Sequence, residues 1–108
     1  MKPAMRGEVW LVDLGIAGKV RPCVVLSKPV GEGDRVLVTV VTHTTSLRGS
    51  EYEVRLRLAY LRPGAFDAQS IVTIPRAKLI RKLGELRDEQ LTAVEFAVRS
   101  WLGLSPDR

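Results

Sequence analysis

Residues 35–42, Arg-Val-Leu-Val-Thr-Val-Val-Thr, favour β-structure more strongly than any other stretch of this sequence. Branched side chains dominate the stretch, and they fit a pleated, half-buried strand well. A turn-forming segment with two glycines, residues 29–34, precedes it. Before that turn lies the apolar run 23–27, whose continuous character predicts a strand buried on both faces. Pro22 opens this run, at a position where no ladder donor is lost.

Four further strands are expected on either side of this pair, interrupted by loops at residues 15–19 and 43–50. Residues 51–58 alternate cleanly, with Val54, Leu56 and Leu58 on one face and charged residues on the other, which is typical of a half-exposed strand. A single helical turn is expected at residues 76–79. The remaining strands are expected at residues 7–14, 68–74 and 80–86.

The C-terminal segment has a different period and predicts one helix of about four turns. Asp88 is a good N-cap, and Gly103 is a natural stop. An apolar stripe at helical spacing is formed by Leu91, Val94, Ala97, Val98, Trp101 and Leu102. Five or six short strands followed by one helix predict a mainly β (α+β) domain spanning residues 1–108, a small antiparallel barrel or curled sheet with the helix packed on it.

Composition narrows the class of protein. Of the 108 residues, 45% are hydrophobic and 27% charged, an ordinary globular mix that excludes disorder as the main state. No apolar run is long enough to span a membrane and no signal-peptide core is visible, so the cytoplasm is expected. A single cysteine, Cys23, and a single histidine exclude an internal disulfide and most zinc sites. Neither a metal nor a cofactor is expected.

The charge balance favours a nucleic-acid partner without requiring one. The chain has 17 Lys and Arg against 12 Asp and Glu, a net charge of +5. A basic stripe opposed only by Glu85 is either a phosphate-tracking surface or a solvated strand face. It consists of Arg76, Lys78, Arg81, Lys82 and Arg87.

Four pieces of the chain, in order, resemble the MazF/PemK family of toxin endoribonucleases. They are residues 6–10 (RGEVW), 21–27 (RPCVVLS), 44–49 (TTSLRG) and 78–86 with the final helix. The resemblance implies an SH3-like or CcdB-like antiparallel β-barrel with a C-terminal helix, usually a homodimer. It also implies metal-independent cleavage of single-stranded RNA, often mRNA at a short recognition sequence, and neutralisation by a cognate antitoxin.

Residue by residue, the resemblance places the catalytic pair at Arg21 and Thr44. The chain departs from the family where Ile16 and Ala17 replace an acidic residue and Val72 replaces an arginine. The residues expected to contact RNA around the pair are Lys19, His43, Thr45, Ser46, Arg48, Gln69 and Ser70.

The chemistry suits these residues, because RNA carries its own nucleophile, the 2′-hydroxyl. An enzyme has to orient that group, stabilise the phosphorane and protonate the leaving oxygen, giving a 2′,3′-cyclic phosphate and a 5′-hydroxyl. The Arg21 guanidinium can grip two phosphate oxygens, unless it is a surface ion pair. Thr44 can donate to the same phosphate, or cap its own loop. His43 faces away from Thr44 if the strand continues, which favours a structural histidine, and Cys23 is expected to be an inert buried thiol.

Two other functions are compatible with the same fold. One is a toxin that inhibits DNA gyrase by binding, as in the CcdB family; the features of the C-terminal helix used by that family are not visible here. The other is a non-catalytic RNA-binding module, whose binding would survive the loss of Arg21.

Overall fold

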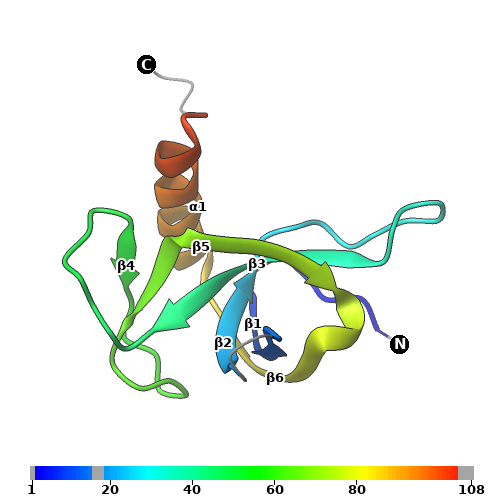
Figure 1. The fold of residues 1–108 in the computed structure, drawn as a ribbon, viewed down its shortest axis with the longest axis horizontal. Helices are drawn as coiled ribbons and strands as arrows, with labels where there is room; N and C mark the ends of the chain where they lie inside the picture. The colour runs from blue at the N-terminus through cyan, green and yellow to red at the C-terminus, as the bar shows by residue number, and fades with distance from the viewer. Residues whose placement is uncertain (1, 16–18, 105–108) are drawn as a thin grey trace.

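The computed structural model describes residues 2–15 and 19–104, and in them six strands precede one helix (Figure 1). The expected loop at 15–19, with Ile16 and Ala17, lies largely outside the described residues. The elements are β1 (Glu8–Asp13), β2 (Val20–Val25), β3 (Leu37–Thr44), β4 (Glu53–Arg55), β5 (Ala65–Pro75), the 3₁₀ turn η2 (Arg76–Lys78), β6 (Leu79–Glu85) and α1 (Asp88–Leu102).

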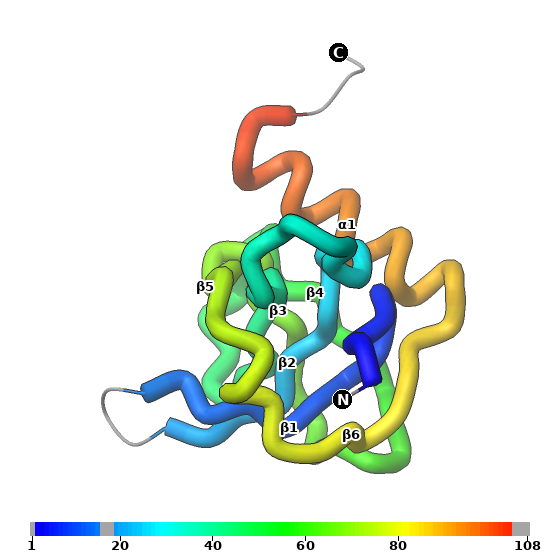
Figure 2. The backbone as a smooth tube through the Cα atoms, turned by 90° about the vertical axis from the view of Figure 1, so that its right-hand side faces the viewer, coloured from blue at the N-terminus to red at the C-terminus, as the bar shows by residue number. Residues whose placement is uncertain are grey.

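All strand pairs are antiparallel, in the order β4-β5-β3-β2-β1-β6. The strands β5 and β6 are consecutive in the chain but lie four spacings apart in the sheet, roughly 19 Å if the sheet were flat. The three residues of η2 span at most about 11 Å. The sheet must therefore curl to bring the two strands together, as the tube in Figure 2 shows.

The curled sheet is not a closed barrel. Its outer strands, β4 and β6, each pair with one neighbour and not with each other. The expected SH3-like or CcdB-like architecture is thus confirmed in strand number, antiparallel pairing and the C-terminal helix, and of the barrel and the curled sheet that the sequence left open, the structure has the curled sheet. The architecture is a mainly β, α+β fold built on an open sheet.

The core lies on both faces of this sheet. One cluster lies between the sheet and α1, which contacts β4 and β5. It contains Val9, Val24, Val41, Phe66, Ala68, Leu86, Val94, Ala97 and Val98. The second cluster fills the inside of the curl. It contains Ala4, Val12, Cys23, Val25, Val38, Val40, Ile74 and Leu79.

Burial on both faces explains the continuous apolar run of β2. Val24 points to the cluster beneath α1, and its neighbours Cys23 and Val25 point into the curl; all three are fully buried, as expected. The strand begins earlier than expected, at Val20, so Pro22 lies inside it. There it is opposite Leu11 of β1, while the ladder to β3 starts only at Cys23, so the missing N–H costs no bond to β3.

Other strand boundaries also differ from the sequence expectation, and β5 begins at Ala65 rather than at residue 68. β3 continues through His43 and Thr44, which were expected in a loop, because both residues pair with β5. β4 covers only Glu53–Arg55 rather than residues 51–58. The alternation beyond Arg55 still reflects burial, since Leu56 and Leu58 pack against the core beneath α1 without a strand partner.

The helix begins one residue earlier than expected, at Asp88, the residue that the sequence predicted as its cap. Arg87 is the N-cap, and its backbone N–H donates to the Gln90 side chain (2.8 Å), while Asp88 lies in the first turn. Gly103 ends the helix in a left-handed conformation, as expected. Trp101 is 42% exposed and lies over Tyr52 at the edge of the core rather than inside it. No helix in the described part of the chain is long and apolar enough to cross a membrane.

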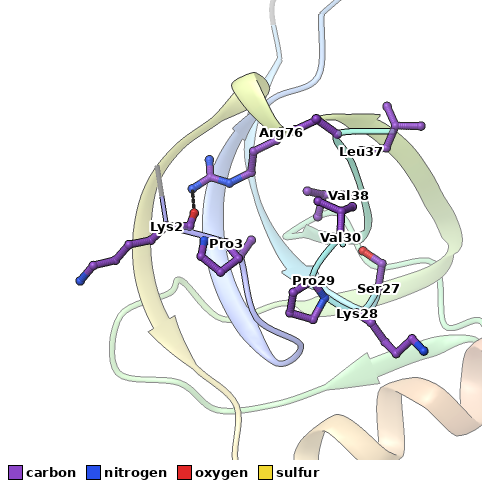
Figure 3. A pocket seen from close by; sticks show the side chains of 11 residues that line it. Lys2, Pro3, Ser27, Lys28, Pro29, Val30, Leu37, Val38 and Arg76 are labelled. Carbon is purple, nitrogen blue, oxygen red and sulfur yellow. Dashed lines mark hydrogen bonds between the residues drawn. The ribbon is translucent and has the colours of Figure 1, made fainter. Parts of the chain in front are cut away.

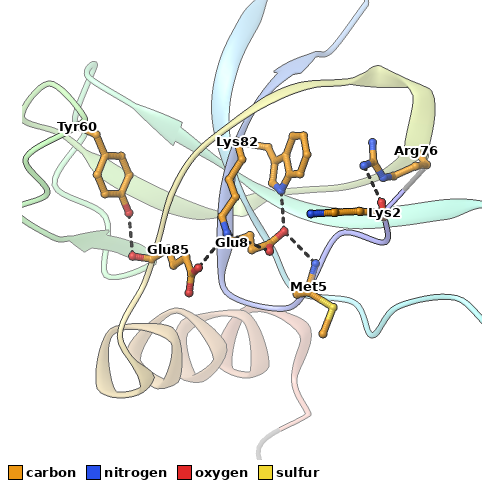
Figure 4. A network of polar contacts seen from close by, with 8 residues as sticks. Lys2, Met5, Glu8, Tyr60, Arg76, Lys82 and Glu85 are labelled. Carbon is orange, nitrogen blue, oxygen red and sulfur yellow. Dashed lines mark hydrogen bonds and ion pairs between the residues drawn. The ribbon is translucent and has the colours of Figure 1, made fainter.

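The basic stripe is partly used inside the fold (Figure 4). Lys82 forms an ion pair with Glu8 that links β6 to β1, and a second one with Glu85 of its own strand. Arg76 lies over the Trp10 ring, 4.9 Å from its centre, and donates to the carbonyl of Lys2. The stripe is therefore not one continuous free surface for phosphates.

Candidate functional site

The antiparallel register of β2 and β3 points Arg21 and Thr44 towards the same position, two residues beyond the last pair of the ladder. The ladder between β2 and β3 pairs Val25 with Val40 and Cys23 with Thr42. Extending that register by two residues brings Arg21 opposite Thr44. Alternate residues of a strand share a face, so both lie on the face that lines the curl, beside the contact between Cys23 Sγ and Thr42 Oγ1 at 3.8 Å.

Thr44 is fixed by a turn that leaves its proton free. The backbone N–H of Ser46 donates to Thr44 Oγ1 at 3.0 Å, so the loop-capping interpretation is correct. A hydroxyl accepts and donates at the same time. The capping bond uses a lone pair of Thr44 and orients the oxygen, and the O–H remains available to a phosphate. The structural and the catalytic interpretations of this residue are compatible.

Arg21 is half-buried at the mouth of the curl, directly before the fully buried part of β2. None of the four ion pairs among residues 2–15 and 19–104 includes it. The alternative of a structural ion pair thus finds no partner in this part of the chain. Next to it, burial raises the pKa of the Cys23 thiol to about 11, and the nearby Arg21 charge only partly opposes this. Cys23 is the inert thiol expected from the sequence.

A carboxylate orders the loop that follows Thr44. Glu53, at the start of β4, accepts hydrogen bonds from the backbone N–H groups of Arg48 (2.8 Å), Gly49 (2.9 Å) and Ser50 (3.1 Å). These bonds, first among them the one from Arg48, lower the pKa of Glu53. The loop is therefore held at one end by the Thr44 hydroxyl and at the other by this carboxylate.

His43 lies on the opposite face and does not join the pair. Its side chain is 4% exposed, and its ring meets Phe66 edge-on at 5.0 Å. Its Nε2 is buried with no hydrogen-bond partner in the described part of the chain, and burial lowers its pKa. The prediction that His43 contacts RNA is not supported by this placement. The placement instead supports the interpretation of His43 as a structural histidine, because a buried ring that meets another ring edge-on contributes to core packing.

The other expected RNA contacts are all exposed around the same strands. Thr45, Ser46 and Arg48 belong to the loop after β3, and Lys19 precedes β2. Gln69 and Ser70 lie in an irregular part of β5, where residues 67–70 face the single residue Thr42. Asp67 stabilises this bulge by accepting from the Gln69 N–H at 3.0 Å and from the Ser70 hydroxyl at 3.4 Å. Such bulges commonly re-aim side chains.

A hollow of about 270 Å³ lies elsewhere, between the N-terminal segment and the loop after β2 (Figure 3). Lys2, Pro3, Pro29 and Val30 line it, with Arg76 at its rim. None of the expected site residues takes part in it. Among the described residues, no group of three or more His, Cys, Asp or Glu side chains is arranged to hold a metal ion.

Comparison with known proteins agrees with the resemblance found in the sequence. The model of the PemK-like, MazF-like toxin family of type II toxin-antitoxin systems matches residues 5–102. The chain belongs to this family. It is 34% identical over 100 residues to the "Probable endoribonuclease MazF5" of Mycobacterium tuberculosis, a match that covers 86% of the chain and 91% of that protein.

Solved structures of MazF proteins share the fold. An endoribonuclease from a mycobacterial species, in complex with its cognate antitoxin, superposes with a TM-score of 0.79 at 26% identity, covering 94% of this chain and 96% of that one. The Mycobacterium tuberculosis toxin MazF-mt6 gives a TM-score of 0.75 at 27% identity, covering 96% and 99%. The open antiparallel sheet with a C-terminal helix is thus the MazF architecture.

In this MazF-family chain, two contributors to the site escaped the sequence interpretation. Glu53 belongs to the charged face of the alternating segment 51–58, and no local pattern shows that its carboxylate accepts from the N–H groups of Gly49 and Ser50. The second contributor is Gly64, in the segment before β5. Its role depends on how closely it approaches Thr44, which no local pattern reveals.

Proposed function

We propose that this protein is a type II toxin that cleaves single-stranded RNA, including mRNA, at a short recognition sequence without using a metal. The observation that supports the proposal is the register of β2 against β3, whose pairs Cys23–Thr42 and Val25–Val40, continued by two residues, bring Arg21 towards Thr44 on one face. Membership of the MazF-like toxin family and the "Probable endoribonuclease" name of a 34% identical relative support it.

In the proposed reaction the RNA supplies the nucleophile and the protein supplies the surroundings of the phosphate. The 2′-oxygen of the RNA attacks the adjacent phosphorus and loses its proton, the bond from phosphorus to the 5′-oxygen breaks, and that oxygen takes up a proton. The products are a 2′,3′-cyclic phosphate and a 5′-hydroxyl. The substrate supplies the nucleophile, so the protein's task is to hold the phosphate in line and to stabilise its added charge.

Arg21 and Thr44 fit these tasks. The guanidinium presents two parallel N–H donors to two phosphate oxygens and stays charged at any physiological pH, so its main role is electrostatic. Thr44, whose oxygen is oriented by the Ser46 N–H, directs its own O–H to a phosphate oxygen. Lys19 and Arg48, exposed on the flanking loops, add positive charge along the path of the strand.

The partners follow from the family. One relative's structure contains the cognate antitoxin, and we propose that a cognate antitoxin binds and neutralises this protein as well. We also propose that the toxin acts as a cytoplasmic homodimer, which light scattering of the purified protein would test.

The decisive experiment incubates the purified protein with a long single-stranded RNA in excess EDTA and maps the cut ends. We expect discrete cuts with 5′-hydroxyl ends, lost in Arg21→Ala and strongly reduced in Arg21→Lys, which keeps the charge but not the fork. Arg35→Ala, an exposed arginine on the loop before β3, is the matched control and should cleave like the wild type. Intact RNA in the presence of folded wild-type protein would instead indicate a gyrase-binding toxin or a binding module.

A further inference from the structure

A hollow of about 480 Å³ lies beside the end of β3, formed mainly by the segment between β4 and β5. This volume falls within the usual range for ligand sites. Three arginines stand around it, namely Arg55, Arg57 and Arg62, and no acidic residue lines it. It shares no residue with the expected RNA contacts or with the hollow at the N-terminus.

The charge of this hollow is only weakly compensated by the residues that the structure describes. All three arginines are exposed, and none of the ion pairs among residues 2–15 and 19–104 includes any of them. Glu53 feels the charge of Arg55, but its carboxylate is engaged by three backbone N–H groups of its own loop. Three like charges around one concavity raise the local concentration of anions and favour a phosphate that two guanidinium forks can share.

The lining between the arginines is apolar. It is formed by leucines, of which Leu56, Leu58 and Leu61 pack against the core beneath α1 and are held in place by it. Leu47, 38% exposed, comes from the loop after Thr44. An apolar surface within a cationic rim matches a nucleotide, whose base and sugar present flat faces with few charges while its phosphate is an anion.

The hollow is continuous with the predicted catalytic strand. Gly64 forms part of its wall and touches the backbone of Thr44 so closely that a Cβ could not be accommodated there. On the other side of the hollow, Leu47 directly follows Ser46, whose backbone N–H donates to Thr44 Oγ1. Figure 1 shows the tip of β3, the start of β2 and the segment after β4 at the same side of the molecule. An RNA whose phosphate lies between Arg21 and Thr44 can therefore reach this hollow with a neighbouring nucleotide.

We propose that this hollow is a substrate subsite that binds a nucleotide of single-stranded RNA flanking the cleaved bond, with Arg57 and Arg62 holding a phosphate and the leucines supporting the base. The inference rests on the proposed ribonuclease function. An acidic peptide would satisfy the same charges, but the continuity with Thr44 favours the substrate, and the peptide becomes an outcome of the test.

The test compares two double variants with the same loss of charge. Arg57→Gln with Arg62→Gln removes charge from the hollow, and Arg35→Gln with Arg99→Gln removes it from exposed positions outside it. Binding is measured by fluorescence anisotropy with a single-stranded RNA carrying 2′-O-methyl groups, which cannot be cleaved, at several salt concentrations. Cleavage of the unmodified RNA is measured in parallel.

For the hollow variant we expect binding weakened about tenfold at low salt, the scale of losing a charged hydrogen bond. The slope of log affinity against log salt should fall by about 0.7 for each phosphate that the variant no longer neutralises. The KM for cleavage should rise while kcat stays near the wild-type value. Two shortened RNAs, one trimmed on the 5′ side of the cut and one on the 3′ side, locate the flank, since one of them should bind both variants equally well.

Equal affinity and equal salt slopes for the two double variants would overturn the subsite, whether or not the wild type cleaves RNA. Unchanged RNA binding combined with weaker binding of an acidic antitoxin peptide would also overturn it and assign the hollow to the peptide. Failure of the wild type to cleave, with RNA binding still weakened only in the hollow variant, would refute the proposed ribonuclease function and leave the RNA site standing.

Discussion

Replacing Gly64 by alanine tests how the segment before β5 supports the site. A Cβ at this position would lie 2.8 Å from Cε1 of His43 and closer still to the carbonyl oxygen of Thr44. Gly64 is not among the described glycines with positive φ, so the cost is steric rather than torsional. Neither neighbour yields easily, because the His43 ring is buried against Phe66 and the Thr44 carbonyl belongs to β3.

The size of the effect follows from how far the neighbours must move. Ordinary van der Waals contact begins at 3.4 Å, so the backbone of β3 or of the segment before β5 has to shift by about 1 Å. Overpacking that requires backbone movement costs about 1–3 kcal/mol, and this case belongs at the upper end. For a domain of this size, about 3 kcal/mol corresponds to a fall in Tm of roughly 15 °C.

Thermal and urea unfolding measure this cost, and two other glycines calibrate it. In Gly31→Ala the new Cβ meets only the Asp34 carboxylate at 3.6 Å, so stability should stay within about 0.5 kcal/mol of the wild type. In Gly84→Ala the new Cβ meets the Tyr60 ring at 2.5 Å. The Tyr60 side chain can move away, but it then loses its hydrogen bond to the Glu85 carbonyl. We therefore expect a loss of stability between those of the other two variants. If Gly64→Ala were as stable as Gly31→Ala, the close approach to Thr44 would be refuted.

Four further outcomes are expected. Thr44→Ala should lower kcat for RNA cleavage by about 10²-fold, the effect of losing one transition-state hydrogen bond, whereas Thr44→Ser should keep most activity; equal rates for both would remove the hydroxyl from the mechanism. Burial lowers the pKa of His43 below 6.5 and so keeps the ring neutral in the folded protein. As the pH falls below 6.5, the unfolded state binds a proton that the folded state does not, and the stability of the folded state declines. In His43→Phe the Tm should change less between pH 7 and pH 5, and an unchanged pH slope would contradict this. Glu53→Gln should speed amide hydrogen exchange at residues 48–50 while Glu51→Gln, an exposed neighbour, should not; equal exchange in both would show that the carboxylate does not hold the loop. The Cys23 thiol, with its pKa raised to about 11, should resist alkylation at pH 8 until urea unfolds the protein, and rapid labelling of native protein would argue against its burial.

Local patterns in the sequence predicted the strands with two buried faces and the helix. Val24 and Val41 face the helix side while their neighbours face the curl, so β2 and β3 appear as continuous apolar runs. The apolar stripe predicted the helix for the same reason, since its residues Val94, Ala97 and Val98 are all buried. In these segments burial alone determines which residue types are used.

The failures occurred where long-range pairing overrides local character. His43 and Thr44 appear polar and loop-like, but β5 pairs with them and extends β3. Residues 56 and 58 alternate like a strand, but no neighbouring strand is available to pair with them. Barrel closure likewise depends on whether two outer strands meet, which no single segment encodes.

The candidate site shows most clearly the difference between what local patterns determine and what long-range pairing determines. Arg21 and Thr44 are 23 positions apart, and the family resemblance alone named them as a pair. Their juxtaposition depends on the register of β2 against β3, because a slip of one residue would turn Thr44 away from the curl and bring His43 to Arg21. The buried pairs that follow, from Cys23–Thr42 to Val25–Val40, hold the register against that slip.

The same reasoning explains how an ordinary threonine becomes suited to catalysis. A free hydroxyl can rotate and exchange partners with water, so aligning it with a phosphate has an entropic cost at each turnover. In this fold the Ser46 N–H occupies the acceptor side of Thr44, and the Glu53 carboxylate holds the rest of the loop. The oxygen is thus oriented before substrate arrives, by contacts that also stabilise the folded loop. In the proposed mechanism catalysis and stability are therefore coupled through one side chain, and substitutions that loosen the loop should slow cleavage even when Thr44 itself is intact.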